Sequence, residues 1–292
     1  NVGMTANART LEHASRKMLA HPLEEVRQSG REARQTATGD VPTLLKYADP
    51  SPYLVRRRDD VETWLGGDAP PDHSDPVRLV RMMPASEAMI LAACLYPHRQ
   101  ASIDTIVAEL QAAPPDQLQR LAQAVLGGRD RFDAPGRALE HSSFTFEVVL
   151  DQGAYLELKR HRMMSQTPQS LTTRLGYAVP RLLTEAGLES SFRASMEAAA
   201  RAFEELAGWN PDVAAYLVPN AFHRRVVLTM NLREAFHFCE LRAAANAHFS
   251  MRRIAFRLAD VLHEAIPLLA GFIRLPEGTT WEQIERQHFT QS

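Results

Sequence analysis

A strand pattern runs directly into a long helical pattern between residues 221 and 264, and this junction restricts the fold more than any other feature. The segment AFHRRVVLTMN favours a β-strand. From Leu232 to about Glu264, apolar residues recur every three or four positions, which places them on one side of a helix. These positions are Leu232, Ala235, Cys239, Ala243, Ala247, Met251, Ile254, Leu258 and Val261. We therefore predict a strand followed immediately by a long buried helix.

The start of this predicted helix favours an anion. Asn231 is a suitable N-cap residue, and Glu234 three positions later completes a capping-box pattern. A helix start presents free N–H groups and the positive end of the helix dipole, and Arg233 stands beside them. A second basic group, Arg160-His161-Arg162, is predicted near the end of a helix that begins at Gln152. Each group alone is also compatible with a solvated surface.

The remaining periodicities predict a mixed fold. In HSSFTFEVVLD, residues 141–151, aromatic and aliphatic side chains alternate with polar ones, as in a strand buried on one face. A short strand is expected at 77–82. The other predicted helices cover residues 85–96, 103–112, 115–126 and 190–206, together with 7–35, which is broken at His21-Pro22. The charged, Pro- and Gly-rich stretch from Arg56 to Pro76 is predicted to be a linker or a long loop.

Composition excludes several classes of protein. A net charge of −2 and a pI near 6.6 exclude coating of nucleic acid by bulk electrostatics. No apolar run is long enough for a membrane span and no signal pattern opens the chain, so we predict a soluble cytoplasmic protein. Cys94 and Cys239 lie in apolar helical segments and are expected to be buried thiols. The eleven histidines show no paired metal-ligand spacing, and we expect no catalytic metal.

Several motifs follow one another over roughly residues 77 to 270. LEHSSFTF comes first, and Arg160-His161-Arg162 then precedes Ser170 by seven residues. NLREAFHFCELR and AHFSMRRIA come last. Together these motifs resemble the flavin-dependent thymidylate synthases, the ThyX family. The basic triplet and Ser170 match the family signature, LEHSSFTF is similar to its Glu-His-x-x-Phe-Thr-Phe strand, and the last two segments are similar to its long helix, all in the family order.

The resemblance implies an α/β (α+β) domain with a central sheet flanked by long helices, which assembles as a homotetramer with active sites between subunits. It implies bound FAD, reduced by NADPH and used with methylenetetrahydrofolate to methylate C5 of dUMP. It implies no cysteine nucleophile. The partner is then a pyrimidine nucleotide, with no nucleic acid and no membrane.

The resemblance also assigns roles residue by residue. Arg242 matches the family arginine that polarises the uracil ring and is the expected catalytic residue. Ser170 matches the serine of the substrate loop, where its role is positioning. The expected cofactor-binding residues are Arg160, His161, Arg162, Asn231, Arg233 and His237. The expected substrate-binding residues are Glu157, Ser170, Arg174 and Arg242.

The sequence departs from the family pattern mainly where the nucleotide should bind. Glu157 stands where a glutamine normally contacts the nucleotide, and a carboxylate there would repel a phosphate or read a different base edge. Arg174 is displaced by two positions from the expected arginine. The other departures are Pro135-Gly136-Arg137 for His-x-Ser/Thr, Pro168 for Glu or Gln, Thr172 for Arg and Ala215 for Arg. Flavin contacts therefore match the family better than dUMP contacts.

An N-terminal segment repeats the motif of the second helix. Asn7, Arg9 and His13 have the same spacing as Asn231, Arg233 and His237, and Met18 stands at the position of Arg242. We therefore predict a parent protein with two tandem domains. The expected boundaries are 1–58 for the helical remnant of the first repeat, 59–76 for a linker and 77–292 for the flavin-binding domain. A dimer of two-repeat chains would imitate the four-domain assembly of the family.

Three interpretations follow from the sequence. The first is a thymidylate synthase-like enzyme that acts on dUMP or a related pyrimidine nucleotide. The second is a diverged homologue that binds FAD but has lost methylation and serves a structural or regulatory role. The third is a helical scaffold without flavin, in which the arginines are merely solvated.

Overall fold

The computed structural model describes residues 5–64, 75–130 and 132–290, which divide into two compact units. One unit contains the described residues before position 70 together with Glu205–Tyr216, and the other contains the rest of the chain. The first unit is helical. Its elements are α1 (Ala8–Leu19), α2 (Glu24–Asp40), α3 (Pro52–Glu62), α10 (Pro211–Ala214) and the start of η3 (Ala215–Leu217).

The second unit is built on a four-stranded antiparallel sheet in the order β1-β2-β4-β3, with strands β1 (Val77–Met82), β2 (Ser143–Asp151), β3 (Ser165–Pro168) and β4 (His223–Asn231). In the central pair, Ser143 lies opposite Asn231 and Asp151 opposite His223. β3 was not predicted, because its four residues SQTP lack an apolar alternation. Pro168 is tolerated there because β3 is an edge strand.

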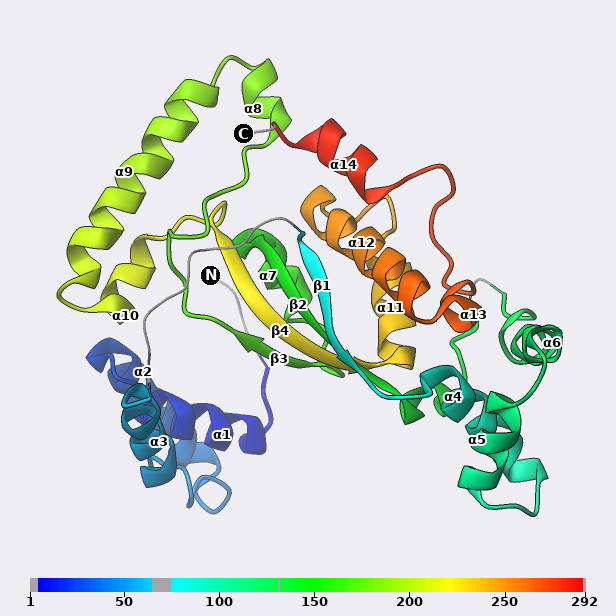
Figure 1. The fold of residues 1–292 in the computed structure, drawn as a ribbon. Helices are drawn as coiled ribbons and strands as arrows, with labels where there is room; N and C mark the ends of the chain where they lie inside the picture. Colours follow the sequence, from blue (N-terminus) through cyan, green and yellow to red (C-terminus); the bar gives the residue numbers. More distant parts are fainter. Residues whose placement is uncertain (1–4, 65–74, 131, 291–292) are drawn as a thin grey trace. The chain divides into compact units, whose positions relative to one another are not determined.

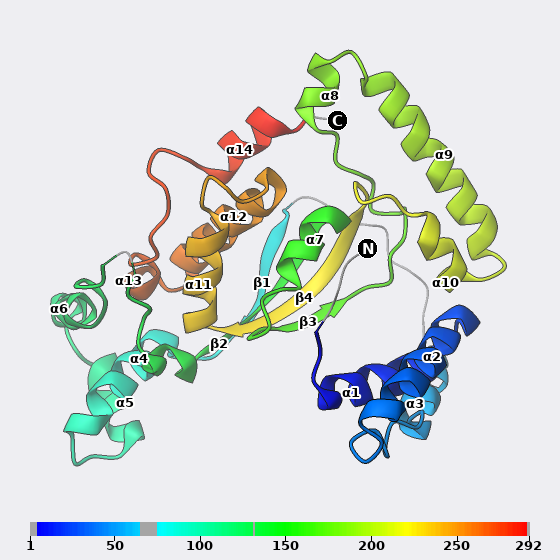
Figure 2. The same ribbon diagram turned by 180° about the vertical axis from the view of Figure 1, so that it is seen from behind.

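Helices α7 (Gln152–Leu158), α11 (Leu232–Arg242) and α12 (Phe249–Ala265) lie on one face of the sheet (Figures 1 and 2). The other helices of this unit are α4 (Ser86–Leu95), η1 (Tyr96–His98), α5 (Ile103–Gln111), α6 (Pro115–Leu126), η2 (Arg137–His141), α8 (Arg181–Glu185), most of α9 (Glu189–Ala207), α13 (Pro267–Ala270) and α14 (Trp281–His288). No helix among the described residues is both long and apolar enough to cross a membrane.

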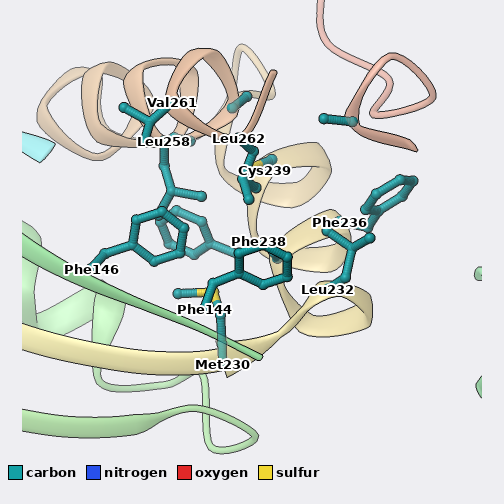
Figure 3. Close-up of a cluster of buried hydrophobic side chains, with 14 of the residues drawn as sticks. Phe144, Phe146, Met230, Leu232, Phe236, Phe238, Cys239, Leu258, Val261 and Leu262 are labelled. Carbon is teal, nitrogen blue, oxygen red and sulfur yellow. The ribbon is translucent and has the colours of Figure 1, made fainter. Parts of the chain in front are cut away.

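The core forms where the sheet meets α11 and α12 (Figure 3). Phe144 and Phe146 of β2 and Met230 of β4 point toward these helices, where they meet Phe238 and Leu258. All five side chains are buried. The alternating apolar residues of the strands and the apolar residues at three-to-four spacing in the helices therefore pack against each other in one interface, which fixes α11 on the sheet.

The prediction of a single helix from Leu232 to Glu264 is wrong. α11 ends at Arg242, residues 243–248 form turns, and α12 begins at Phe249 with His248 as its N-cap. The apolar spacing hides this break because both helices bury their stripes against the same core. The end of α11 brings Arg242 to the edge of a turn.

The prediction that Arg160 and Arg162 lie in a helix is also wrong. α7 ends at Leu158, and its last turn tightens through bonds from Arg160 N to Glu157 O and from His161 N to Leu158 O. The Gln166 side chain of β3 donates to Leu158 O (3.1 Å) and His161 O (2.9 Å). The basic triplet is therefore held in a turn between α7 and β3.

Two further predictions need correction. The loop predicted from Arg56 begins later, since α3 continues to Glu62; positions 65–74 lie outside the described residues. Cys239 is buried, and burial raises the pKa of its thiol far above the usual range, but Cys94 is only partly buried. A protonated, inaccessible thiol at Cys239 is not a nucleophile.

Candidate functional site

The junction of β4 and α11 opens on a pocket of about 380 Å³. Its lining comprises Phe132, Asp133, Ala134, Pro135, Glu140, Met163, Asn231, Arg233, Glu234, His237, Glu240 and Arg274. Three of the predicted cofactor-binding residues, Asn231, Arg233 and His237, thus share one cavity. Local sequence explains part of this, because α11 starts directly after β4 and the three residues stand at its N-cap and in its first two turns.

Asn231 caps α11 as predicted. Its side-chain oxygen accepts a hydrogen bond from Glu234 N at 2.9 Å, which satisfies one of the free N–H groups of the helix start. The Glu234 side chain, assigned to a capping box from the sequence, lies 2.9 Å from His161 Nδ1. Glu234 is therefore a site residue that the sequence did not reveal. The sequence signal that could have indicated this role is the position of the Glu234 carboxylate on the apolar, core-facing side of the helix.

Arg233 joins α11 to the opposite wall of the pocket. Its Nε donates to Pro135 O at 2.9 Å, and Nη1 pairs with Glu140 at 3.2 Å. Hydrogen bonds from Arg137 first, and then the charge of Arg233, lower the pKa of the partly exposed Glu140 carboxyl. The guanidinium remains partly exposed, so part of it faces the pocket.

A second ion-pair group, also absent from the sequence prediction, holds the other side of the pocket. Glu240 accepts from Arg129 at 3.1 Å and from Arg274 at 2.8 Å. Arg274 also donates to the carbonyls of Asp130 and Asp133. Burial alone would raise the pKa of Glu240, but hydrogen bonds from Arg274 and the charge of Arg129 outweigh it, and the pKa is lowered. We call Glu240, Arg129 and Arg274 the Glu240 clamp.

Arg242 is held by two residues of the α7 end and the following turn. Its Nε donates to His161 Nε2 at 2.9 Å, Nη1 pairs with the Glu157 carboxylate at 2.9 Å, and Nη2 lies 3.4 Å from Glu157 O. Both charged side chains are largely covered. The predicted catalytic residue and one predicted substrate residue are thus in direct contact.

The structure does not gather all predicted residues. Among the described residues that line the pocket, Met163 follows the basic triplet, but Arg160, His161 and Arg162 are absent. Arg160 and Arg162 are exposed, whereas His161 is buried. Ser170 and Arg174 are exposed beyond β3, and Arg174 Nε lies 3.9 Å from Glu204. The described residues contain no cluster of three or more potential metal ligands.

The N-terminal unit reproduces one detail of the site. Asn7 caps α1 by accepting from Thr10 N at 2.9 Å, as Asn231 does from Glu234 N. Arg9, like Arg233, pairs with a carboxylate, that of Glu12, at 2.7 Å. The two helices share an Asn N-cap, and the tandem repeat stays a prediction.

Comparisons with known proteins agree with the fold and with the motifs. The family model described as "Thymidylate synthase complementing protein", Thy1, matches residues 78–268. A "UPF0159 protein" of Chlamydia muridarum is 29% identical over 94% of this chain and 54% of its own length, and one of Thermoplasma acidophilum is 27% identical over 94% and 56%. The chain thus spans about half the length of these relatives.

Two further comparisons name an activity for the similar protein. A "Flavin-dependent thymidylate synthase" of Geobacter sulfurreducens is 27% identical over 66% of this chain and 84% of that protein. The solved ThyX of Helicobacter pylori, complexed with FAD and dUMP, shares the fold with a TM-score of 0.52 and 19% identity, covering 69% of this chain and all of that one. Since the family model matches well over half of the residues, the chain belongs to the Thy1 family of thymidylate synthase complementing proteins.

Proposed function

We propose that this protein binds FAD at the α11 pocket and catalyses reductive C5 methylation of dUMP or a related pyrimidine nucleotide. Methylenetetrahydrofolate would supply the carbon and NADPH the reducing equivalents. The observation that carries the proposal is that α11 bears the pocket residues Asn231, Arg233 and His237 at its start and Arg242 at its end. One rigid helix thus joins the proposed cofactor side to the proposed substrate side.

The residues present suit a flavin nucleotide. Arg233 offers a guanidinium with N–H groups for a phosphate or a ring carbonyl, and the α11 start adds a positive dipole end. The lining carboxylates of Glu140, Glu234, Glu240 and Asp133 would repel phosphate. Glu140 and Glu240 are already paired with arginines and Glu234 is bonded to His161, whereas the Asp133 carboxylate accepts a hydrogen bond from Asp130 N. When bound, the flavin would supply electrons for the reduction.

The pocket volume lies near the lower end of the range for ligand sites, roughly 300–1,000 Å³. It therefore suits part of an FAD molecule rather than all of it. Arg160 and Arg162, exposed in the turn that follows α7, would contact a portion of the cofactor outside the pocket. Because the pocket suits only part of FAD, we propose that a second copy of the chain completes the cofactor site. The protein would then be a homo-oligomer, such as a dimer of two-repeat chains.

Arg242 is proposed to face the pyrimidine ring rather than the phosphate. Its guanidinium lies between the carboxylate of Glu157 and, through His161, that of Glu234. Two carboxylates around one guanidinium leave no excess positive charge for a phosphate dianion. A neutral ring that gathers negative charge during the reaction is better suited to this environment. Ser170 and Arg174 would then position the nucleotide.

A second candidate function is FAD binding without methylation. The Glu157–Arg242 ion pair favours it, because a pyrimidine must displace that carboxylate to reach the guanidinium. Pro168, Thr172 and Ala215, which stand at altered substrate positions, point in the same direction.

The purified protein tests both functions in two steps. We expect flavin absorbance in the visible spectrum, or saturable uptake of added FAD. We then expect tritium release from C5-labelled dUMP with NADPH and methylenetetrahydrofolate. Flavin binding without tritium release would support the second candidate, and absence of any flavin binding would exclude both.

A further inference from the structure

His161 is the one member of the basic triplet whose side chain is buried. Its exposed fraction is 5%, whereas Arg160 and Arg162 on either side are exposed. The turn that carries it is fixed by the hydrogen bond from Gln166 to its carbonyl, and its ring packs edge-on against Phe238 at a centroid distance of 5.1 Å. The imidazole is thus held in one orientation, with both ring nitrogens against α11.

Each ring nitrogen of His161 meets a different charged partner. Nε2 lies 2.9 Å from Arg242 Nε, and Nδ1 lies 2.9 Å from the Glu234 carboxylate. A guanidinium N–H can only donate a hydrogen bond, so Nε2 must accept and carries no proton. The neutral ring then has its proton on Nδ1 and donates it to Glu234. The two partners together select a single tautomer.

We infer that His161 is a positioning residue that fixes the Arg242 guanidinium for the substrate, in the tautomer protonated at Nδ1. This inference deepens the proposed function and rests on it for the role of Arg242. The long Arg242 side chain would otherwise retain several rotamers, and a bond to a buried, oriented acceptor removes that freedom. Glu234, which also lines the pocket, holds the imidazole and thereby links the α11 start to Arg242.

Charged side chains contact both ring nitrogens of the imidazole and so fix its orientation. The titratable and charged groups that face it are Glu234 and His237 from α11, Arg242 at the end of the same helix, and Glu157 beyond Arg242. Protonation of Nε2 would place two donors face to face and break the bond to Arg242. Direct contact of a ring nitrogen with a cofactor would likewise require breaking one of these bonds.

Nitrogen-15 NMR of histidine-labelled protein tests the tautomer independently of any activity. For His161, assigned by comparison with the His161→Asn spectrum, we expect a protonated Nδ1 and an unprotonated Nε2 at neutral pH. A protonated Nε2, or an averaged pattern like that of a solvent-exposed histidine such as His98, would overturn the inference.

Two substitutions separate the two bonds of the ring. The amide oxygen of His161→Gln can take the place of Nε2 and accept from Arg242, whereas His161→Asn reaches only toward Glu234. We expect turnover of His161→Gln to stay within about tenfold of wild type, because only the bond to Glu234 is lost. We expect kcat of His161→Asn to fall about 100-fold, as misplacement of a catalytic group by about 1 Å can do. Both variants should retain flavin.

Flavin content, kcat and KM are measured together, with His98→Gln as a control on an exposed histidine. Equal activity of the Gln and Asn variants in an active protein would overturn the positioning role. Loss of flavin from both would assign His161 to the cofactor instead and also overturn it. Wild-type protein that binds no flavin and releases no tritium would refute the proposed function, and the tautomer measurement would remain a valid test of the geometry.

Discussion

The Arg242 guanidinium uses all three of its nitrogens within the chain, on His161 and on the side chain and carbonyl of Glu157. The guanidinium is therefore well oriented, but each of its nitrogens already has a hydrogen-bond partner. A ring that binds to it must replace Glu157, which is the more exposed of the two partners at 26% of its side chain. Breaking the Glu157–Arg242 ion pair therefore costs free energy, and this cost weakens the binding of a nucleotide to Arg242.

We predict that Glu157→Gln lowers the KM for dUMP by several-fold. An amide bonds a guanidinium less strongly than a carboxylate does, since charge-assisted bonds are roughly twice as strong as neutral ones. Steady-state kinetics of the variant provide the measurement. Glu109→Gln, which removes the exposed ion pair between Glu109 of α5 and Arg99, is the control and should leave KM unchanged. A higher KM in Glu157→Gln would mean that the carboxylate binds the substrate directly.

Asn231 and Arg233 were predicted together because both stand at the start of one capped helix, and the family resemblance added His237. The contact between His161 and Glu234 could not be predicted from the sequence. These residues are 73 positions apart and meet only because the turn after α7 packs on α11. The Glu240 clamp was missed for the same reason, with Arg129 lying 111 positions from its partner. Long-range ion pairs leave no periodic trace in a sequence.

Among the elements, α11 organises the site through its contacts at both ends and along one side. Its core stripe was predictable, because apolar spacing alone specifies it. The break after Arg242 was not, since residues 243–248 contain neither Gly nor Pro and continue the apolar spacing. The four residues of β3 were likewise invisible, because an edge strand this short carries little burial pattern.

The Glu240 clamp ties α11 to the loop that forms the pocket wall, and we predict that its contribution to stability depends on pH. The folded-state pKa of Glu240 lies below its ordinary value of 4.5, because Arg274 and Arg129 favour the carboxylate. Its stabilisation is therefore fully present above the ordinary value and is lost as pH falls through the folded value.

Thermal unfolding of wild type and Glu240→Gln measures this effect. At pH 7 the variant should melt at a lower temperature, because two guanidinium groups lose an anionic partner. The difference between the two proteins should narrow progressively below about pH 4.5. A difference that stays constant into acid would show that the carboxylate charge contributes nothing.

The α1–α2 pair of the N-terminal unit gives a prediction about packing. A Cβ at Gly30 would lie 2.8 Å from the Cβ of Met18, so the two helices approach closely at that point. In an open helix, Gly→Ala gains about 1 kcal/mol, but overpacking a close contact costs about 1–3 kcal/mol. We expect Gly30→Ala to destabilise this unit.

Gly39 on the same helix provides a matched control, because a Cβ there meets no atom within 4 Å. Gly39→Ala should be neutral or slightly stabilising. Hydrogen exchange of the α1 and α2 amides reports on this unit separately from the sheet. Equal protection in the two variants would contradict the close approach of α1 and α2.

At the scale of the whole molecule, the chain combines a Thy1-family domain with an N-terminal helical unit whose first helix repeats the Asn cap of α11. The relatives from Chlamydia and Thermoplasma are nearly twice as long as the part that matches. The tandem arrangement of two domains stays a prediction. The mixed α/β architecture was predictable from residue periodicity and motif order, whereas the grouping of Glu205–Tyr216 with the N-terminal unit was not.

Binding of FAD should stabilise the folded protein by mass action. With FAD at about 100 times its Kd, the free energy of unfolding is expected to rise by about 2.7 kcal/mol. Differential scanning calorimetry with and without FAD measures the shift, and riboflavin at the same concentration shows how much depends on the diphosphate and adenosine that riboflavin lacks. A melting temperature that does not respond to FAD would argue against a built cofactor site.

The division of labour along α11 is tested most directly by flavin retention and tritium release measured in parallel on Arg233→Ala and Arg242→Ala. Arg233 lines the pocket and Arg242 does not, so substitution of the two residues should affect different steps, flavin binding and turnover. We predict that Arg233→Ala loses most of its flavin, whereas Arg242→Ala keeps its flavin and releases no tritium from C5-labelled dUMP. Equal flavin loss in both variants, or full tritium release by Arg242→Ala, would contradict the proposed site.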